Sequence, residues 1–464
     1  MISPARQAAY QVLRAVATGR QDLPAALARS RTRLTDPRDT ALVAEIATGT
    51  LRWRGALDHL IAWAARRPLD RLDAEVLDIL RLSLYQLLHL DRVPAPAVVD
   101  EAVQLTRRSG KQSAASLVNA VLRGLIRARQ ALPLPPRPSL TGDQPAPGTP
   151  EEAAALDYLS ITQSHPRWLA ARWLSRLGFA AAEQWVRFNN TPAPMTLRVN
   201  TLVTSAAALT RELAEAGVEV RDSSWAPDAL VVEHGNPLRA TSVPSDRYLV
   251  QSEASQLVGL FTGAAAGERV LDACAAPGGK TIVIANLMRN TGLLIASDRR
   301  ERRVALLRTT LRQAGVAAHL VTLDMLAPVP FDPSRARFDR FLLDVPCTGL
   351  GTLRRDPDIR WRRTEQDVRD SAARQRAMLH HAAEAVRPGG LLIYATCSSE
   401  PEENDEVIEA FLDEHPEFAL EDARLDPVPP DGCRRALDAR GCLRTSPSMH
   451  QLEAFFAARL RRRL

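Results

Sequence analysis

The first 130 residues carry apolar positions at the spacing of amphipathic α-helices. Such residues recur on one face of three stretches, AAYQVLRAV (8–16), EVLDILRLSLYQLLHL (75–90) and SLVNAVLRGLIRAR (116–129). Apolar residues three, four and seven positions apart lie on one side of a helix. We therefore expect an all-helical domain over residues 1–130, whose last helix carries the basic residues Arg123 and Arg127.

A proline-rich segment follows the helical pattern. Residues 131–150 contain seven prolines and show no apolar period, and such a composition is typical of an extended linker. Beyond it, a helical stretch at 166–178 precedes the alternating segment MTLRVNTL (195–202), which predicts a strand. We expect a linker over residues 131–160 and a mixed α+β subdomain over residues 161–262.

From residue 263 onward, short apolar runs alternate with amphipathic helical stretches. The runs are ERVLDACAA, GLLIASD, AHLVTLD, FDRFLLDVP, GGLLIYATC and EAFFAARL. Strands that are apolar throughout are typical of a parallel sheet covered by helices on both faces. The pattern predicts an α/β domain over residues 263–464, with a ligand site at the carboxyl ends of its strands.

Composition narrows the class of protein without identifying it. Of the 464 residues, 45% are hydrophobic and 25% are charged, as in ordinary globular domains. No apolar run reaches the ~18 residues of a membrane span, and the first residues lack the apolar core of a signal peptide. We therefore expect a cytosolic protein that does not cross a membrane.

The charged and sulfur-bearing residues exclude several kinds of site. The net charge is +6, and only Lys111 and Lys280 among the 60 basic residues are lysine. We attribute the arginine excess mainly to codon usage, but the positive balance is compatible with an anionic partner. The five cysteines are odd in number and widely spaced. We therefore expect neither a disulfide framework nor a metal site.

The apolar runs of the last domain end in polar or reactive residues. These are Asp272, Asp298, Asp324, Asp344 followed by Cys347, and Thr396 followed by Cys397. Because the carboxyl ends of parallel strands meet at one edge of a sheet, these residues should converge there. A helix cap accounts for any one of the aspartates about as well as a ligand site does. It does not account for four at successive strand ends.

The turn after the first of these strands has the composition of a ligand-binding loop. CAAPGGKT (274–281) lacks the leading glycine of a Walker A loop and the GxGxxG spacing of a dinucleotide-binding turn. Gly278 and Gly279 let the backbone approach a ligand closely, and Asp298 is placed to bind ribose hydroxyls. With a further acid at Asp324, the pattern favours S-adenosylmethionine, a nucleoside without a pyrophosphate.

The two strand-end cysteines suit methylation of a pyrimidine ring. Carbon 5 of cytosine or uracil attacks a methyl sulfonium poorly, and addition of a thiolate to carbon 6 makes it nucleophilic. The carbon-5 proton must then leave so that the thiol is eliminated. Cys347 and Cys397 can share these two tasks in either order, and Asp344 can accept a hydrogen bond from the exocyclic amine of cytosine. A buried structural thiol accounts for one such cysteine better than for two at the same edge.

Three segments resemble the signature segments of the RNA cytosine-5 methyltransferases of the Nol1/Nop2/Sun group. They are LDACAAPGGKT, LLDVPCTGLGTLRRDPDIRW and YATCSSEPEEN. Residues 1–130 resemble a NusB-like RNA-binding domain, and this order of domains resembles that of group members that modify small-subunit ribosomal RNA. The likeness covers nearly the whole chain apart from the linker. The segment MHQLEAFFAARL (449–460) departs from the glycine-rich turn that usually precedes the last strand of the group.

The resemblance implies roles for individual residues. It makes Cys397 the nucleophile and gives Cys347 the task of assisting product release, with Asp344 beside them. It matches residues 161–262 to an RNA-positioning subdomain, in which Arg198 and Asn200 are candidate RNA contacts in addition to Arg123 and Arg127. The cofactor contacts that it implies are Cys274, Ala275, Ala276, Pro277, Gly278, Gly279, Lys280, Asp298, Asp324 and Asp344.

We therefore expect a monomeric cytoplasmic enzyme that uses S-adenosylmethionine to methylate carbon 5 of a cytosine in 16S ribosomal RNA. Two alternatives stay open: the same chemistry on another RNA such as tRNA, and a non-catalytic RNA-binding factor built on residues 1–130. A P-loop nucleotidase is disfavoured because Cys274 stands where the Walker A motif requires glycine.

Overall fold

The computed structural model describes residues 2–331, 337–426 and 430–464, and the chain forms two compact units. Residues 1–192 and 353–362 make up one of them, which we call the helical unit. Residues 193–352 and 363–464 make up the other, which we call the sheet unit. None of the helices in the described residues has the length and apolar character needed to cross a bilayer.

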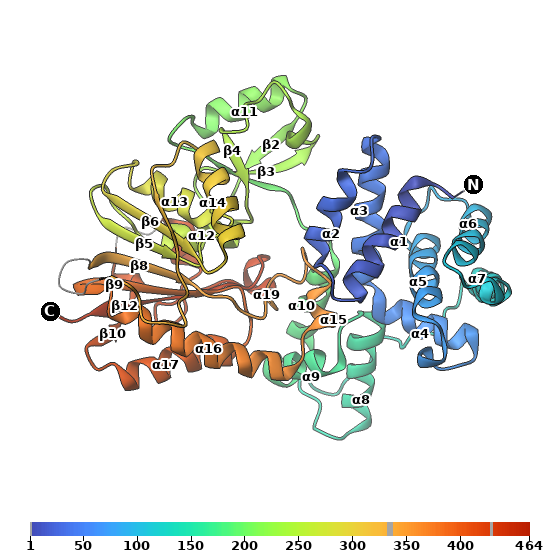
Figure 1. Cartoon of the computed structure of the whole chain (residues 1–464). Helices are drawn as coiled ribbons and strands as arrows, with labels where there is room; N and C mark the ends of the chain where they lie inside the picture. The colour runs from blue at the N-terminus through green and yellow to red at the C-terminus, as the bar shows by residue number, and fades with distance from the viewer. Residues whose placement is uncertain (1, 332–336, 427–429) are drawn as a thin grey trace. The chain divides into compact units, whose positions relative to one another are not determined.

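The helical unit contains the all-helical domain that the apolar spacing predicts (Figure 1). Its helices are α1 Pro4–Ala17, α2 Leu23–Arg31, α3 Pro37–Arg52, α4 Arg54–Ala65, η1 Leu69–Arg71, α5 Ala74–His89, α6 Ala95–Arg108, η2 Gln112–Ala114, α7 Ala115–Arg127, α8 Pro150–Asp157, η3 Tyr158–Thr162, α9 Arg167–Leu177, α10 Phe179–Asn190 and α15 Ile359–Arg362.

Helix α5 is buried on most of its circumference and contributes much of the core of this unit. Its buried Arg81 would be costly without partners, because a charge loses its hydration on burial. Nε of Arg81 donates to Oδ1 of Asp58 at 2.6 Å, and Nη1 donates to Oδ1 of Asp78 at 3.1 Å. These two carboxylates compensate the buried charge.

The segment expected to be a linker is part of the helical unit. Residues 131–149 contain neither helix nor strand, but from Pro150 the chain forms α8 and η3, with the Thr149 side chain capping the helix by accepting from Glu152 N. The proline-rich stretch also packs against its neighbours, since Thr162 Oγ1 donates to Pro135 O at 2.7 Å and Phe179 N donates to Asp143 O at 2.7 Å. The structure thus differs from an extended linker that reaches residue 160.

Residues 353–362 leave the sheet unit and pack within the helical unit. The side chain of Arg360 is fully buried there, and its Nη1 donates to Ser164 O and Asn190 Oδ1, both at 3.0 Å. Trp361 Nε1 donates to Leu51 O at 2.6 Å. Burial without a carboxylate among these partners lowers the pKa of Arg360 to about 9. The hydrogen bonds of Arg360 and Trp361 hold residues 353–362 within the helical unit.

The sheet unit begins with a small antiparallel sheet of order β2-β3-β1-β4. Its elements are β1 Thr196–Val199, α11 Ala206–Glu215, β2 Glu219–Asp222, β3 Ala229–His234, η4 Pro237–Arg239 and β4 Tyr248–Val250. Leu209 and Leu213 of α11 pack against Leu197, Val199 and Leu230 of the sheet. The alternating segment at 195–202 is therefore a strand over its central residues, as predicted.

The larger sheet has the order β10-β12-β9-β8-β5-β6-β7, with β11 paired to β12. Its strands are β5 Arg269–Ala273, β6 Leu293–Asp298, β7 His319–Thr322, β8 Phe338–Asp344, β9 Val386–Thr396, β10 Phe418–Leu420, β11 Leu443–Arg444 and β12 Phe456–Arg462. The helices and turns around it are α12 Glu253–Phe261, α13 Gly279–Leu287, α14 Glu301–Gln313, α16 Glu365–Ala383, η5 Pro401–Glu403, α17 Asp405–Glu414, η6 Ala423–Leu425, α18 Asp431–Arg435 and α19 Pro447–His450.

The last strand corrects the expectation of a wholly parallel sheet. Strands β9, β8, β5, β6 and β7 are parallel, but β12 is antiparallel to β9, with Phe456 opposite Thr396. The chain therefore enters β12 at the carboxyl end of β9 and runs back. A parallel strand would need a crossover to the opposite edge, and the short helix α19 (Pro447–His450) provides none.

Helices cover both faces of the larger sheet, as the apolar runs predict. Figure 1 shows α16 and α17 on one face and α12 and α13 on the other. Successive residues of β8 alternate between the two cores, because Phe341 and Leu343 pack with the α16 and α17 side and Leu342 packs with the α12 and α13 side. The sheet is a mixed, Rossmann-like α/β sheet.

Candidate active site

The two strand-end cysteines lie side by side. Strands β8 and β9 are neighbours and run parallel, with Asp344 paired to Ala395, so the residues that follow them emerge at the same edge. Cys347 and Cys397 are half-buried free thiols whose Sγ atoms are 3.1 Å apart. This distance allows one thiol to donate a hydrogen bond to the other sulfur.

A glycine lets the loop after Cys347 approach the loop of Cys397. Gly351 N donates to Cys397 O at 3.0 Å, and Gly351 O accepts from Ala454 N at 3.0 Å. A Cβ at position 351 would lie 1.9 Å from Ala454 O and 2.8 Å from Cys397 O. Both neighbours are backbone atoms, so a side chain at this position would push the two cysteine loops apart.

A buried carboxylate joins the two cysteine loops. Glu403 is fully buried, and its Oε1 accepts from Thr348 N at 2.9 Å and from Gln375 Nε2 at 3.0 Å. Its Oε2 accepts from the hydroxyls of Thr348 and Ser398. Because Thr348 follows Cys347 and Ser398 follows Cys397, one side chain fixes the positions of both thiols.

The cation beside the thiols is Lys280. Its Nζ lies 2.7 Å from Asp344 Oδ2, and its ammonium interacts electrostatically with Cys397. Burial lowers the pKa of Lys280, but the carboxylate of Asp344 outweighs burial and holds the pKa above its usual value. The other oxygen of Asp344, Oδ1, makes no hydrogen bond to the described residues. It is therefore available to a ligand.

Arg354 and Arg355, which follow Cys347 in sequence, belong to the helical unit rather than to the sheet unit. Nε of Arg354 donates to Pro192 O at 3.1 Å, and its guanidinium lies 4.4 Å from the ring centroid of Phe188. Arg355 forms an ion pair with Asp356 at 3.1 Å.

Cys347 is the thiol of the pair whose pKa the surroundings raise. The hydrogen bond with Cys397 and then burial raise the pKa of Cys347 well above its ordinary value, and the negative charge of Glu403 acts in the same direction. In its neutral form the Cys347 thiol can donate a hydrogen bond to the neighbouring sulfur.

The predicted cofactor turn has the backbone geometry that its glycines suggest. Gly278 has a φ of 113°, and an added Cβ would lie 3.0 Å from Leu307 Cδ1, so the turn requires glycine here. Cys274 also has a positive φ, of 62°. Burial raises the pKa of Cys274 to about 12, which keeps this thiol neutral. Ala275 and Ala276 are buried, while Pro277 at the tip of the turn is exposed.

The strand-end aspartates have different environments. Asp298 is 5% exposed at the end of β6, where Arg303 Nε lies 3.3 Å from its Oδ2. Asp324 lies two residues beyond β7 and is exposed. Asp272 is fully buried, accepts from Thr281 Oγ1 at 2.6 Å, and has its pKa raised to about 7 by burial. Asp272 thus supports the turn from inside, whereas Asp298 lies at the end of β6 and Asp324 lies just beyond the end of β7.

The candidate RNA contacts fall into two groups. Arg198 and Asn200 are buried: Arg198 Nη1 donates to Pro227 O at 2.6 Å, and Asn200 Nδ2 donates to Asp246 O and Ala314 O. Both residues hold backbone segments together, and their part in RNA binding stays a prediction. Arg123 and Arg127 line a groove of about 640 Å³ between α6 and α7, together with Arg107. The part of Arg123 and Arg127 in RNA binding also stays a prediction.

Sequence reasoning missed the position of Glu403 and the electrostatic interaction of Lys280 with Cys397. The acidic EPEEN segment (400–404) has the pattern of a solvated helix start, and nothing in the local pattern indicates that Glu400 and Glu403 are both buried. Lys280 could have been singled out from the sequence, because it is one of only two lysines among 60 basic residues. A lysine retained against such a bias indicates a position where arginine does not fit.

Comparisons with protein families divide the chain into three matched parts. Residues 263–461 match the family model described as 16S rRNA methyltransferase RsmB/F. Residues 3–127 match the NusB family. Residues 165–239 match the ferredoxin-like domain described as Methyltr_RsmF/B-like. The unmatched stretch between the first two parts along the chain contains the proline-rich segment.

Similar proteins cover almost the whole chain. The probable ribosomal RNA small subunit methyltransferase B of Bacillus subtilis is 34% identical, over 91% of this chain and 90% of that protein. The ribosomal RNA small subunit methyltransferase B of Pseudomonas putida is 34% identical, over 88% of each chain. The solved structure of PH0851 superposes with a TM-score of 0.78 at 26% identity, over 99% of each chain. By this full-length similarity, the chain belongs to the RsmB/F family of ribosomal RNA small subunit methyltransferases.

Proposed function

We propose that the protein methylates carbon 5 of a cytosine in small-subunit ribosomal RNA through a covalent bond between Cys397 and the base. The observation that carries this proposal is the pair of free thiols 3.1 Å apart at neighbouring strand ends. The family performs methyl transfer to RNA from S-adenosylmethionine, and its relatives of similar length are named for the small ribosomal subunit. Methylation of a base through a thiol adduct is one reaction that uses two neighbouring thiols, one to attack the ring and one to assist release of the product.

The residues of the sheet edge fit the methyl donor. When bound, S-adenosylmethionine supplies an electrophilic methyl group on a sulfonium. The turn from Cys274 to Lys280 brings backbone to the ligand edge without side chains at Gly278 and Gly279, and the buried carboxylate of Asp298 is suited to ribose hydroxyls. The exposed Asp324 lies beyond the next strand and offers a further acceptor.

The surroundings of the two thiols support Cys397 as the nucleophile. The raised pKa of Cys347 favours the neutral form of that thiol, whereas the ammonium of Lys280 interacts electrostatically with Cys397. Its sulfur forms a bond to carbon 6 of cytosine, and the electron pair of the carbon 5–carbon 6 double bond moves into the ring. The ring takes up a proton at nitrogen 3, and carbon 5 then attacks the methyl group.

Release of the product requires the second thiol. Once the sulfur of Cys397 is bonded to carbon it carries no negative charge, so its hydrogen bond with Cys347 weakens and its charge no longer raises the pKa of Cys347. Cys347 can then give its proton to solvent and accept the carbon-5 proton. The electrons of that carbon–hydrogen bond re-form the double bond, Cys397 leaves as thiolate, and nitrogen 3 loses its proton. One proton is released in each cycle.

The choice of cytosine is assigned to Asp344. Lys280 donates a hydrogen bond to Oδ2 of Asp344. The other oxygen, Oδ1 of Asp344, is available to accept a hydrogen bond from the exocyclic amine of cytosine. Uracil carries a carbonyl oxygen in place of this amine, and a carbonyl oxygen cannot donate a hydrogen bond to a carboxylate. This arrangement supports cytosine as the substrate, as the signature segments imply.

The experiment that tests the function uses small-subunit ribosomal RNA whose cytosines carry tritium at carbon 5. Incubation with the full-length protein and S-adenosylmethionine should release tritium to water, because methylation replaces the carbon-5 hydrogen. Bisulfite sequencing of the product should then show one protected cytosine. Methyl incorporation without tritium release would overturn the choice of carbon 5. Activity on tRNA alone would overturn the choice of RNA, and no methyl incorporation would favour an RNA-binding factor.

Lys280→Arg is expected to lower kcat at least about tenfold although it preserves the positive charge. The guanidinium is larger and planar, and Lys280 Nζ lies between Asp344 at 2.7 Å and the ring of Phe455 at 5.7 Å. The arginine would place its positive charge at a different point, so Asp344 would lose its ion pair in the present geometry and Cys397 would lose its electrostatic partner. The matched control is Lys111→Arg, the only other lysine, which pairs with Asp73 in the helical unit. Equal steady-state methylation rates for the wild type, Lys280→Arg and Lys111→Arg would contradict the positioning role of Lys280.

A further inference from the structure

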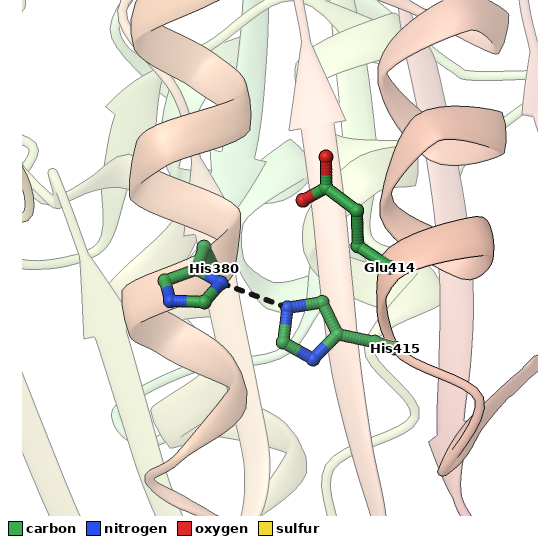
Figure 2. Close-up of side chains that lie close together, drawn as sticks. All are labelled: His380, Glu414 and His415. Carbon is green, nitrogen blue, oxygen red and sulfur yellow. Dashed lines mark hydrogen bonds between the residues drawn. The ribbon is translucent and has the colours of Figure 1, made fainter.

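A second cluster of metal-ligating side chains lies away from the thiol pair, where the C-terminal ends of α16 and α17 meet. Figure 2 shows His380 on the last turn of α16 facing His415, with Glu414 beside it at the end of α17. The candidate ligand atoms of the three residues lie within 4.8 Å of one another. His380 and His415 are far apart in sequence, so no ligand-spacing motif reveals the cluster.

The ring of His415 is fixed by its surroundings. Only 13% of its side chain is exposed. The ring stacks on Phe411, with centroids 4.4 Å apart and an interplanar angle of 23°, and it meets the ring of Phe418 nearly edge-on. A histidine held in this way has lost its rotamer freedom before any ligand arrives, which favours binding.

A carboxylate sets the tautomer of His415. Its Nδ1 lies 2.9 Å from Oε1 of Glu417. A carboxylate oxygen accepts hydrogen bonds, so this contact favours the tautomer of His415 that carries its proton on Nδ1. The lone pair is left on Nε2, the atom that faces His380. Metal-binding histidines are commonly oriented by a carboxylate in this way.

The spacing of the two nitrogens is close to what a zinc ion requires. His380 Nδ1 lies 3.0 Å from His415 Nε2, whereas two nitrogens about 2.0–2.1 Å from a tetrahedral zinc ion lie roughly 3.3 Å apart. His380 and Glu414 are exposed and can adjust by this amount. Without an ion, the same nitrogens are satisfied by a hydrogen bond between the two rings, and this is the competing interpretation.

We propose that His380, His415 and Glu414 bind a divalent zinc ion, with Glu417 orienting His415. Two imidazole nitrogens and one carboxylate oxygen are ligands of the kind that zinc prefers, and water completes the tetrahedral site. The ion would join the ends of α16 and α17. Because α16 also carries Gln375, which contacts Glu403, the zinc would brace the helix layer behind the cysteine loops.

The test is a zinc titration of the full-length protein against a competing chromophoric chelator. His380→Ala should bind one zinc ion fewer than the wild type. Glu417→Gln should bind the same number but hold one ion about 10–100-fold more weakly, because the carboxylate that orients His415 is lost. His319→Ala, which removes an exposed histidine of β7, should leave stoichiometry and affinity unchanged.

The thiol pair is another place where zinc could bind, and thiol labelling separates the two sites. Zinc at Cys347 and Cys397 would slow alkylation of these cysteines and would persist in His380→Ala. Zinc at the histidine cluster would leave alkylation unchanged. The proposal is overturned if His380→Ala and the wild type bind zinc with equal stoichiometry and affinity, or if all bound zinc disappears on alkylation.

Discussion

Cys397→Ala is expected to abolish methylation of ribosomal RNA, by a factor on the order of 10³ or more, whereas Cys347→Ala is expected to trap the RNA on the protein. The first variant lacks the sulfur that bonds to carbon 6. The second retains that sulfur but lacks the neighbouring thiol 3.1 Å away that accepts the carbon-5 proton. Bond formation then proceeds and elimination does not, so the adduct should accumulate.

The trapped species is measured as a slowly migrating protein–RNA band on a denaturing gel with labelled RNA. It should require S-adenosylmethionine for full yield and should be absent from the Cys347→Ala/Cys397→Ala double variant. Cys442→Ala is the matched control, since it removes a buried thiol that lies outside the pair. Normal turnover by Cys347→Ala, together with an adduct in Cys397→Ala, would reverse the two roles.

The convergence of the thiols could be predicted because it depends on few assumptions. Continuous apolar runs separated by helices indicate parallel strands, and parallel strands deliver their carboxyl ends to one edge. Cys347 and Cys397 each follow such a run, and the structure places β8 and β9 next to each other. The same reasoning located the glycine turn and Asp298. It did not reveal that β12 runs antiparallel, because an apolar run has no direction.

Burial of polar residues could not be predicted from local pattern. The alternation in MTLRVNTL places Arg198 and Asn200 on the polar side of a strand, yet the structure covers that side as well, with the carbonyls of Pro227, Asp246 and Ala314. Residues 353–362 likewise follow a strand of the sheet unit and pack in the helical unit through Arg360. Such long-range contacts leave no period in the sequence.

Glu403→Ala is expected to lower kcat about 10²-fold while leaving the affinity for S-adenosylhomocysteine unchanged. The carboxylate accepts from Thr348 N, Thr348 Oγ1, Ser398 Oγ and Gln375 Nε2, so alanine removes an acceptor from four buried donors at once. Thr348 and Ser398 are the residues next to the two thiols. Release of both loops should misplace the sulfurs, and a displacement near 1 Å can cost about 10²-fold in rate.

Glu403→Gln separates the geometry of this side chain from its charge. Its remaining oxygen can still accept from Thr348 N and Gln375 Nε2, and its new amide can donate to the two hydroxyls, because hydroxyls accept as well as donate. If Glu403 acts by positioning, glutamine should restore kcat to within about tenfold of the wild type and restore the adduct yield in a Cys347→Ala background. Glu406→Ala, an exposed glutamate on the first turn of α17, serves as control. Equal losses in the alanine and glutamine variants, at temperatures where both are folded, would show that the negative charge itself is required.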